Sequence, residues 1–451
     1  MVIRLDATRS PLDALSQFVD LPDPSLLQSA ADGHPLSRYS FLTADPVARI
    51  TAGANEWPSV RERVRGTLAT PPAHAAQLPP FQGGWIGWFC YELGTAFDRV
   101  TRHPHQPYPV ADIALGLYDW VIAWDHALGD AWLISTGIDA AGDGNERRAR
   151  QRADTVLQRW HADRCTEPSR ANESGASPRS DFSAAQYQAA VEQVIAYVLA
   201  GDIFQANLAQ RFSTSFDGDP FALYANLTGG SPAPMAAFMR RGRVSVASAS
   251  PERFVQLDMP SRHVETRPIK GTRPRHADAA RDAELARALE ASAKDRAENV
   301  MIVDLMRNDL SRVCVPGSVR TPSLCTLESH PTVHHLVSTV TGDLRADCDA
   351  LDLLAATFPG GSITGAPKLR AMEIISELEP VARGVYAGAI GWIGLDGAMD
   401  TSIAIRTVTV ADNVATVHAG GGITARSIPT DEYQESLDKA RALIAAIMAA
   451  R

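Results

Sequence analysis

The sequence predicts an α+β fold in which large antiparallel sheets are flanked by helices. Residues 384–423 contain strand-like segments joined by short Gly, Asp and Asn turns, which is typical of antiparallel strands. Residues 83–94 (GGWIGWFCYELG) are aromatic and punctuated by glycine, as in a buried strand. Helical segments do not alternate with strands at the regular spacing of a parallel doubly wound sheet.

Composition is that of an ordinary globular protein. The chain has 451 residues, 45% of them hydrophobic and 21% charged, so we expect two domains or one large composite domain. The net charge of −9 is spread over mixed acidic and basic residues, which argues against a nucleic-acid-binding surface. No apolar run approaches the ~18–20 residues of a membrane span, and the start lacks a secretion signal. Five widely spaced cysteines without a C-x-x-C pair indicate reduced thiols, so a cytoplasmic protein without membrane or nucleic-acid partners is expected.

The first part of the chain, residues 1–164, is predicted to be rich in strands. Residues 112–126 and 130–136 flank a short Ala-Leu-Gly turn and predict a β-hairpin. Residues 165–183 are rich in Ser, Pro, Asn, Gly and Glu, which predicts a linker or mobile loop. The catalytic part is expected to be residues 184–451.

The second part is predicted to open with a capped amphipathic helix that ends at Gly201 and leads into a strand at Phe204–Phe212. Further long helices are expected at Ala277–Arg307, Lys368–Glu379 and Asp431–Ala449. Three or four strands of an antiparallel meander precede the last of these helices.

Two of these helices carry acids at helical spacing. Asp295 and Glu298 are three residues apart, and Glu432, Glu435 and Lys439 lie on one helical face. Capping and the helix dipole account for Asp295 and Glu432, but not for the second acid one turn deeper in each helix. Two such carboxylate faces could converge on Mg²⁺, which takes one or two carboxylates together with water and an anionic substrate.

Two glycine-rich stretches, Phe358–Lys368 and His418–Ser427, lack the spacing of a phosphate-binding Walker loop. Each could present backbone N–H groups to a carboxylate. The alternative is that each is merely a tight turn between strands.

Lys270 is one of only four lysines among 43 basic residues. An amine can lose its proton and act as a nucleophile, whereas arginine stays charged. Glu252 follows the strand predicted at Val244–Ser248, and Lys270 is expected to end the following hairpin strand, so the two would share a pocket. The alternative is a solvated glutamate and a surface lysine.

Several ordered motifs resemble those of the chorismate-utilising enzymes. They are GDIFQANLAQRF, SASPERF, TRPIKGTRPR, DRAENVMIVDLMRNDL, HHLVSTVTGDL, FPGGSITGAPKLRAMEII, GAIGWIG and GGGITARSIPTDEYQE. This family includes component I of anthranilate synthase and of aminodeoxychorismate synthase, isochorismate synthase and salicylate synthase. The resemblance covers nearly everything from Phe182 to Ile447 and implies a four-layer αββα sandwich, with residues 1–164 in the same composite domain.

The resemblance also implies a metal site. Glu298 and Glu435 would hold Mg²⁺, which bridges to the ring carboxylate of chorismate, while Asp295 and Glu432 would support it through water. Most relatives have glutamate where this chain has Asp295, which has the shorter reach.

Substrate and catalytic roles follow from the same resemblance. His335 would lie near the reacting ring, and Glu252 would be the general acid that helps the 4-hydroxyl group leave. Substrate contacts are expected from Thr364, Gly365, Tyr386, Arg406, Lys439 and the backbone of Gly420, Gly421 and Gly422.

Two positions indicate the branch of the family. Gln205 stands where the isochorismate and salicylate synthases carry a water-activating lysine, which disfavours addition of water. Lys270 stands where anthranilate synthases carry alanine, and this resembles the aminodeoxychorismate synthases. Lys270 would then attack C2 of chorismate as the 4-hydroxyl group departs, and ammonia would enter at C4.

The chain shows no recognisable glutaminase motif, so a separate glutamine amidotransferase subunit is expected to supply ammonia. A separate aminodeoxychorismate lyase would convert the product toward para-aminobenzoate and folate. The alternative activity is that of anthranilate synthase component I, in tryptophan biosynthesis. An alternative of another class is a non-catalytic regulator that binds chorismate or tryptophan, because residues 26–42 resemble the tryptophan-binding region of relatives, with Gln28 in place of a usual glutamate.

Overall fold

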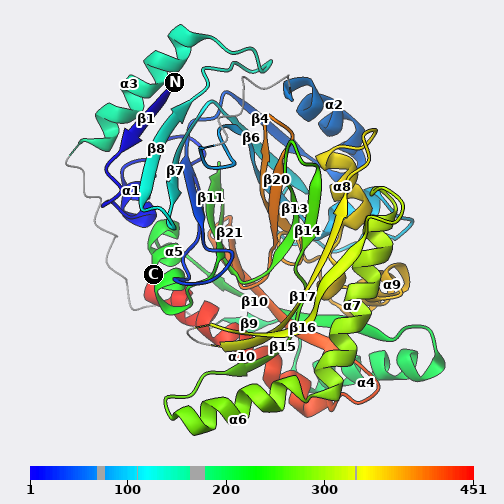
Figure 1. Ribbon diagram of the computed structural model, residues 1–451. Coiled ribbons are helices and arrows are strands. Elements are labelled where there is room, and N and C mark those ends of the chain that lie inside the picture. The colour runs from blue at the N-terminus through cyan, green and yellow to red at the C-terminus, as the bar shows by residue number, and fades with distance from the viewer. Residues whose placement is uncertain (69–76, 109, 163–177, 331–332) are drawn as a thin grey trace.

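Two large antiparallel sheets pack face to face, and helices cover their outer faces (Figure 1). The computed structural model describes residues 1–68, 77–108, 110–162, 178–330 and 333–451. The predicted four-layer αββα sandwich of antiparallel sheets is confirmed.

The first sheet has twelve strands within the described residues. In spatial order they are β1 (Val2–Leu5), β8 (Asp130–Ser135), β7 (Trp120–Asp125), β3 (Tyr39–Thr43), β2 (Ser25–Gln28), β11 (Met235–Arg241), β12 (Val244–Ser250), β21 (Thr407–Ala411), β22 (Val414–Ile423), β10 (Gln205–Ser215) and β18 (Gly365–Ala366), with β9 (Arg179–Ser180) paired to β10.

The second sheet has ten strands in the same described ranges. Their order is β15 (Ile269–Pro274), β17 (Val333–Asp343), β14 (His263–Thr266), β13 (Arg253–Leu257), β20 (Met399–Ile403), β19 (Ala389–Gly394), β5 (Gly84–Phe89), β6 (Ile113–Tyr118) and β4 (Ala48–Ala52), with β16 (Arg320–Ser329) paired to β17. Both sheets combine strands from before and after the predicted linker, so the two parts of the chain build one sandwich.

Three hydrophobic cores hold the layers together. One contains apolar residues of α1 (Pro11–Ser16), α3 (Glu146–Trp160), α5 (Pro220–Gly230) and α10 (Pro429–Ala449), packed on the first sheet. Another contains residues of α2 (Trp57–Thr67), α4 (Ala184–Ala200), α7 (Ala293–Ser311), α8 (Ala350–Thr357) and α9 (Lys368–Leu378). The third lies between the sheets and includes Trp88, Tyr118 and Trp392. α6 (Ala279–Glu290) lies beside β15.

Two predictions about single elements are wrong. Residues 112–126 are not one strand of a hairpin, because the chain leaves the second sheet after β6 and enters the first as β7, and only β7 and β8 form the hairpin. The helix predicted at Ala277–Arg307 is two helices. Ser292 separates α6 from α7, and its hydroxyl accepts a hydrogen bond from the Asp295 backbone N–H, which caps the start of α7.

The predicted meander at residues 384–423 contains four strands, but it does not lie in one sheet. β19 and β20 pair in the second sheet, whereas β21 and β22 pair in the first. The crossing falls at Arg406, whose backbone φ of 49° turns the chain.

Other predicted elements agree with the structure. α4 ends at Ala200, and Gly201 caps it with φ 85°, a left-handed conformation that glycine adopts without strain. β10 follows as expected. Most of the predicted linker, residues 165–183, lies outside the described residues, although its last part contains β9 and the Ser183 cap of α4.

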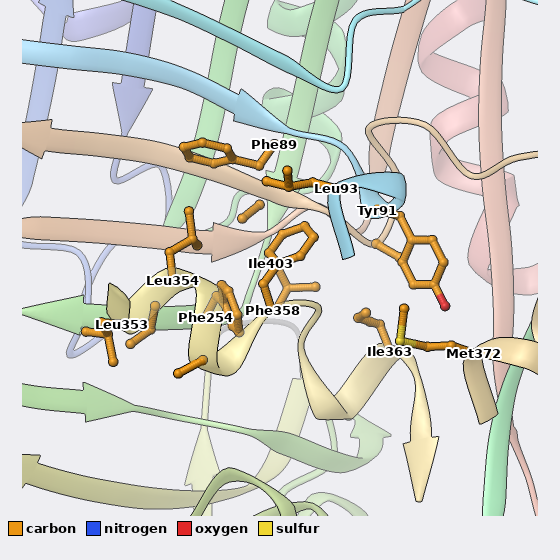
Figure 2. Packing of buried hydrophobic residues seen from close by; sticks show 14 of the residues in the cluster. Phe89, Tyr91, Leu93, Phe254, Leu353, Leu354, Phe358, Ile363, Met372 and Ile403 are labelled. Atoms are coloured by element: carbon orange, nitrogen blue, oxygen red, sulfur yellow. The ribbon is translucent and has the colours of Figure 1, made fainter. Parts of the chain in front are cut away.

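Aromatic and aliphatic side chains fix the turn η3 (Gly361–Ile363) beside the second sheet. Figure 2 shows Ile363 among the residues of this core, with Phe358 near Phe254 of β13 and Ile403 of β20. The rings of Phe254 and Phe358 lie 6.1 Å apart. Because Thr364 and Gly365 follow Ile363 directly, this packing fixes where two predicted substrate contacts lie.

A buried ion pair anchors the same turn. Arg383 NH2 lies 2.6 Å from Glu379 Oε1, and both side chains are almost fully buried. Arg383 also donates to the carbonyl oxygens of Ile363 and Asn207, at 2.8 and 2.5 Å. Glu379 accepts from the Ala209 backbone N–H at 2.9 Å. The pair therefore connects β10 to η3.

We expect Arg383→Met to lower the free energy of unfolding by about 3–5 kcal/mol, because it leaves the Glu379 carboxylate buried and unpaired. The double variant Arg383→Met/Glu379→Leu should be more stable than the single variant, since it removes the uncompensated charge. Midpoints of guanidinium unfolding measure both. Equal loss in the two variants would contradict a charge-based role.

Candidate active site

Glu252 and Lys270 both lie beside Ser362, which contacts each of them. Glu252 lies where the chain passes from β12 in the first sheet to β13 in the second, and its Oε1 accepts the Ile269 backbone N–H at 3.5 Å. Lys270 Nζ donates to the carbonyl oxygen of Ser362 at 3.2 Å. The expected strand position of Lys270 is wrong in detail. It does not end a hairpin strand but is the second residue of β15, because β14 stops before Pro268, which lacks an N–H for the ladder.

The surroundings of Glu252 and Lys270 shift both pKa values so that the uncharged form of each group is favoured. Burial raises the pKa of Glu252 to about 7, while the Ser362 hydroxyl and the charge of Lys270 oppose the shift. Burial lowers the pKa of Lys270, and the charges of Glu298 and Glu252 oppose that shift. A buried carboxyl and a half-buried amine thus lie beside Ser362 with both pKa values displaced.

Two of the four predicted metal ligands, Glu432 and Glu435, lie beside Gly421. A Cβ atom on Gly421 would lie 3.2 Å from Glu432 Oε2 and 3.5 Å from Glu435 Oε1. Glu298 Oε1 is buried and has no hydrogen-bond partner among the described residues. Burial raises the pKa of Glu298 and of Glu432, whereas the Lys439 ammonium, 2.7 Å from Glu435 Oε1, helps to hold the pKa of Glu435 below its usual value.

Asp295, the fourth predicted ligand, is engaged elsewhere. Its Oδ2 accepts from Arg273 NH2 at 3.0 Å. The site is tight here, because a Cβ on Gly271 would lie 2.9 Å from the Asp295 Cβ, and Gly271 has φ 85°. Asp295 therefore holds β15 against α7 through Arg273.

Within the described part of the chain, donor atoms of one group of three ligand-type side chains lie within 4.8 Å of one another: His34, Glu328 and His330. Sequence reasoning did not point to this group. The rings of His34 and His330 stack 4.1 Å apart at 25°, so their in-plane lone pairs do not converge, and Arg267 is hydrogen-bonded to Glu328. This geometry does not favour a metal.

His335 provides an uncharged imidazole that can donate or accept a hydrogen bond. Arg406 provides a positive charge. His335 is buried, its Nδ1 lies 2.9 Å from Thr272 Oγ1, and burial with nearby Arg406 lowers its pKa to about 3. The Arg406 guanidinium makes no hydrogen bond or ion pair within the described ranges, and burial lowers its pKa. A half-buried guanidinium without a protein partner is a ready site for a substrate carboxylate.

Glu252 and Arg406 both lie in segments where the chain passes from one sheet to the other. The backbone N–H of Ile403 donates to the carbonyl oxygen of Glu252 at 3.1 Å. The backbone N–H of Ala249 donates to the carbonyl oxygen of Arg406 at 3.0 Å. The chain changes sheets at both places, so each residue lies where the two sheets meet.

The glycine-rich stretches are not tight turns between strands. Gly420, Gly421 and Gly422 lie inside β22, and a Cβ on Gly420 would lie 1.9 Å from the Leu208 carbonyl oxygen. Lys439 Nζ donates to the Gly420 carbonyl oxygen at 2.8 Å. Glycine is required here because the neighbouring strand and the α10 side chains approach the backbone closely.

Thr364, Gly365 and Tyr386 lie beside the Arg383 network. Thr364 Oγ1 donates to the Gly360 carbonyl oxygen at 2.9 Å, and Gly365 has φ 155° with β10 close behind it. The ring of Tyr386 stacks on His418 at 5.0 Å. Thr364 is fully buried, and its hydroxyl and its backbone N–H and carbonyl groups are all hydrogen-bonded within the protein, so its predicted contact with substrate stays a prediction.

Sequence reasoning missed three contributors to this site: Ser362, Arg383 and Lys294. Ser362 contacts both Glu252 and Lys270, but a lone serine in a glycine-rich stretch carries no signal of that role. Gln205 was noted only as a replacement for lysine. It is fully buried, and neither amide atom of its side chain has a hydrogen-bond partner in the described structure.

A cavity of about 370 Å³ lies between the sheets, and Lys270 is not among the residues that line it. Residues from the segment 26–42 line it, together with Arg253, Arg267 and Trp392. Gln28 Oε1 accepts from the Tyr224 hydroxyl at 2.8 Å. The region that resembles a tryptophan site therefore opens on a real cavity.

Comparison with known proteins identifies the family of this chain. The family model described as chorismate binding enzyme matches residues 23–445. The chain therefore belongs to this family.

Individual relatives cover nearly the whole chain. Aminodeoxychorismate synthase component 1 of Salmonella typhimurium is 42% identical, over 94% of this chain and 93% of the relative. Anthranilate synthase component 1 of Streptomyces coelicolor is 38% identical, over 98% of this chain and 87% of the relative. The crystal structure of anthranilate synthase component I from Streptococcus pneumoniae superposes with a TM-score of 0.80 at 31% identity, over 92% of this chain and 93% of that one.

Among the helices that the structure describes, none combines the length and apolar character needed to cross a membrane.

We expect Glu252→Gln to stabilise the protein at pH 8 but not at pH 4. The pKa of Glu252 is raised from 4.5 to about 7 on folding, so burial favours the protonated form. The cost of ionising it is absent below pH 4.5 and fully present above pH 7, where it reaches about 3 kcal/mol. Thermal unfolding of both proteins at the two pH values measures the difference. A variant that gains equally at both pH values would contradict the shifted pKa.

Proposed function

We propose that this chain aminates chorismate at C4 to give 4-amino-4-deoxychorismate, the activity that the name of its Salmonella relative describes. The observation that carries the proposal is the pairing of Lys270, an amine with a lowered pKa, with the buried acid Glu252. A neutral amine is a nucleophile, and a carboxyl with a pKa near 7 keeps a protonated fraction at neutral pH.

In the proposed reaction the Lys270 amine forms a bond to C2 of chorismate. Both conjugated ring double bonds shift, the C4–O bond breaks, and Glu252 gives its proton to the departing hydroxyl group, which leaves as water. Ammonia then attacks C4, both double bonds return to their original places, and the C2–N bond to Lys270 breaks. Arg at position 270 could not perform the first step because its guanidinium stays protonated.

Substrate carboxylates would be held by cations and backbone donors. Arg406 offers a guanidinium without a partner among the residues that the structure describes, and Lys439 lies at the Gly420–Gly422 strand. His335 stays neutral at neutral pH, so it can hydrogen-bond to the ring without adding charge. Tyr386, fixed between His418 and Arg383, would close one side of the pocket.

The acids fit a divalent cation, and we propose Mg²⁺. Glu298 Oε1 is buried without a partner in the described structure, and Gly421 leaves space beside Glu432 and Glu435. Carboxylate oxygens are the ligands that Mg²⁺ prefers. When bound, Mg²⁺ would neutralise the ring carboxylate of chorismate. Glu298 and Glu435 would hold it, with Glu432 beside them, whereas Asp295 would act through its hold on β15.

Ammonia would come from a separate glutamine amidotransferase subunit, since component 1 in the relatives' names implies a second component. The product would pass to a separate aminodeoxychorismate lyase on the way to para-aminobenzoate. Within the described residues, Cys90, Cys314, Cys325 and Cys348 have free thiols and are buried, which supports the cytoplasm as the compartment.

The second candidate is anthranilate synthase component I, favoured by the 38% identity to the Streptomyces enzyme. Amination would then occur at C2, the atom that Lys270 is proposed to attack. A lysine at the floor of the pocket disfavours this activity because it competes with ammonia for that carbon.

The product decides between the two activities. Purified chain with chorismate, Mg²⁺ and ammonium at alkaline pH should give 4-amino-4-deoxychorismate, identified by mass and by its ring hydrogens in NMR. Glutamine in place of ammonium should give no product until an amidotransferase subunit is added. Anthranilate as the product would contradict the proposal, and no turnover at all would favour a non-catalytic role.

Substitution of Lys270 tests the covalent step. Lys270→Arg keeps the charge, so a lysine that only pairs with a carboxylate predicts a modest loss, whereas a nucleophile predicts a loss of several orders of magnitude in kcat, up to about 10⁶. Lys439→Arg is the matched control, because charge is its proposed role. Mass spectrometry of the wild type with chorismate and no ammonia should detect an adduct. Near-normal turnover of Lys270→Arg without an adduct would rule out the nucleophile.

A further inference from the structure

Lys294 lies beside the carboxylates of the proposed metal site. Its Nζ is 3.9 Å from Glu298 Oε1, the buried oxygen that has no hydrogen-bond partner in the described structure. The Lys294 ammonium also acts on the other two acids, because its charge lowers the pKa of Glu298, Glu432 and Glu435 alike. The Lys294 side chain is half-exposed, so its ammonium group can move away from the carboxylates into the solvent.

The position of Lys294 works against the local electrostatics of its helix. Ser292 is the N-cap of α7, so Lys294 lies in the first turn, where the helix dipole favours acids and disfavours cations. A lysine four residues before a glutamate is also the weaker order for a helical ion pair. Helix stability therefore does not explain this residue.

Residue usage across the chain singles out the same position. The sequence has four lysines, and arginine supplies its other basic side chains. Lys270, Lys439 and Lys294 all act on the acids of this site. The fourth, Lys368, is buried in an ion pair with Asp309. A lysine presents a compact, flexible point charge, whereas the planar fork of arginine would form a fixed, bidentate pair with a carboxylate.

We infer that Lys294 is a built-in counter-ion of the acid cluster that competes with the divalent cation for Glu298 and thereby sets the affinity of the site. The inference rests on the metal site of the proposed function. With the ammonium beside Glu298, the cluster carries less net negative charge. When a divalent cation binds, Lys294 moves into water, which its half-exposed stem permits. Lys294 would thus weaken binding of the cation and keep its exchange reversible.

The test measures metal binding directly and needs no turnover. Mn²⁺ is titrated into the purified full-length chain without chorismate, and free Mn²⁺ is followed by electron paramagnetic resonance. We expect Lys294→Met to bind Mn²⁺ about three- to tenfold more tightly than the wild type, because one opposing charge is gone from a half-exposed site. Added salt should reduce the difference. Unchanged or weaker binding by Lys294→Met would overturn the inference.

Two further variants test whether the effect belongs to the charge at position 294. Lys294→Arg keeps the charge and can form a fixed, bidentate pair with Glu298, so it should bind Mn²⁺ no more tightly than the wild type. Arg296→Met removes a cation from the same helix at an exposed place about 200° around its axis, so it should have little effect. Tighter binding by Arg296→Met as well would mean that net charge alone acts, which overturns a specific role for Lys294.

Glu298→Gln separates this inference from the proposed function. It should lose most Mn²⁺ binding if Glu298 is a ligand. Retained wild-type affinity in Glu298→Gln would refute the metal site itself. Loss of binding in Glu298→Gln together with no gain in Lys294→Met would refute only the role of Lys294. Circular dichroism of each variant checks that the fold is intact.

Discussion

The buried ion pair of Arg383 and Glu379 is the interaction on which the rest of the site depends. It reaches β10 through the Asn207 carbonyl oxygen and the Ala209 N–H, and it reaches η3 through the Ile363 carbonyl oxygen. A buried charge is tolerated only when its partners are complete, so these partners are held in fixed positions. The positions of Ser362, Thr364 and Gly365 follow from this constraint, and with them the position of the Lys270 amine.

Burial then shifts the pKa values of Glu252 and Lys270. The same low polarity that requires Arg383 to be paired raises the pKa of Glu252 and lowers that of Lys270. Arg406 is half-buried without a protein partner within the described residues, which is costly unless a ligand anion completes it. The charge of Arg406 is therefore unfavourable in the free protein, and the proposed dianionic substrate would stabilise it.

The opposite side of the pocket is built from acids and lysines on two helices. α7 brings Glu298 and Lys294, and α10 brings Glu435 and Lys439. Because each helix carries both an acid and an ammonium group, the cluster is close to electrically balanced on its own. Such a cluster suits the proposed exchange of the Lys294 ammonium group for a divalent cation.

The sequence by itself determined the strands, the capped helices and most of the residues that are proposed to carry the chemistry. Gly201 ends α4 through a purely local requirement for positive φ, and period-2 and period-3.6 patterns mark β10 and α10 because they depend only on near neighbours. The motifs also predicted Glu252, Lys270 and the acids of α7 and α10. Tertiary structure decided where the chain changes sheets, since β6 and β7, or β20 and β21, have the same alternation whichever sheet they join. It also decided that Asp295 pairs with Arg273 and that Arg383 is buried. Those outcomes depend on which surfaces pack together, and no local pattern encodes that.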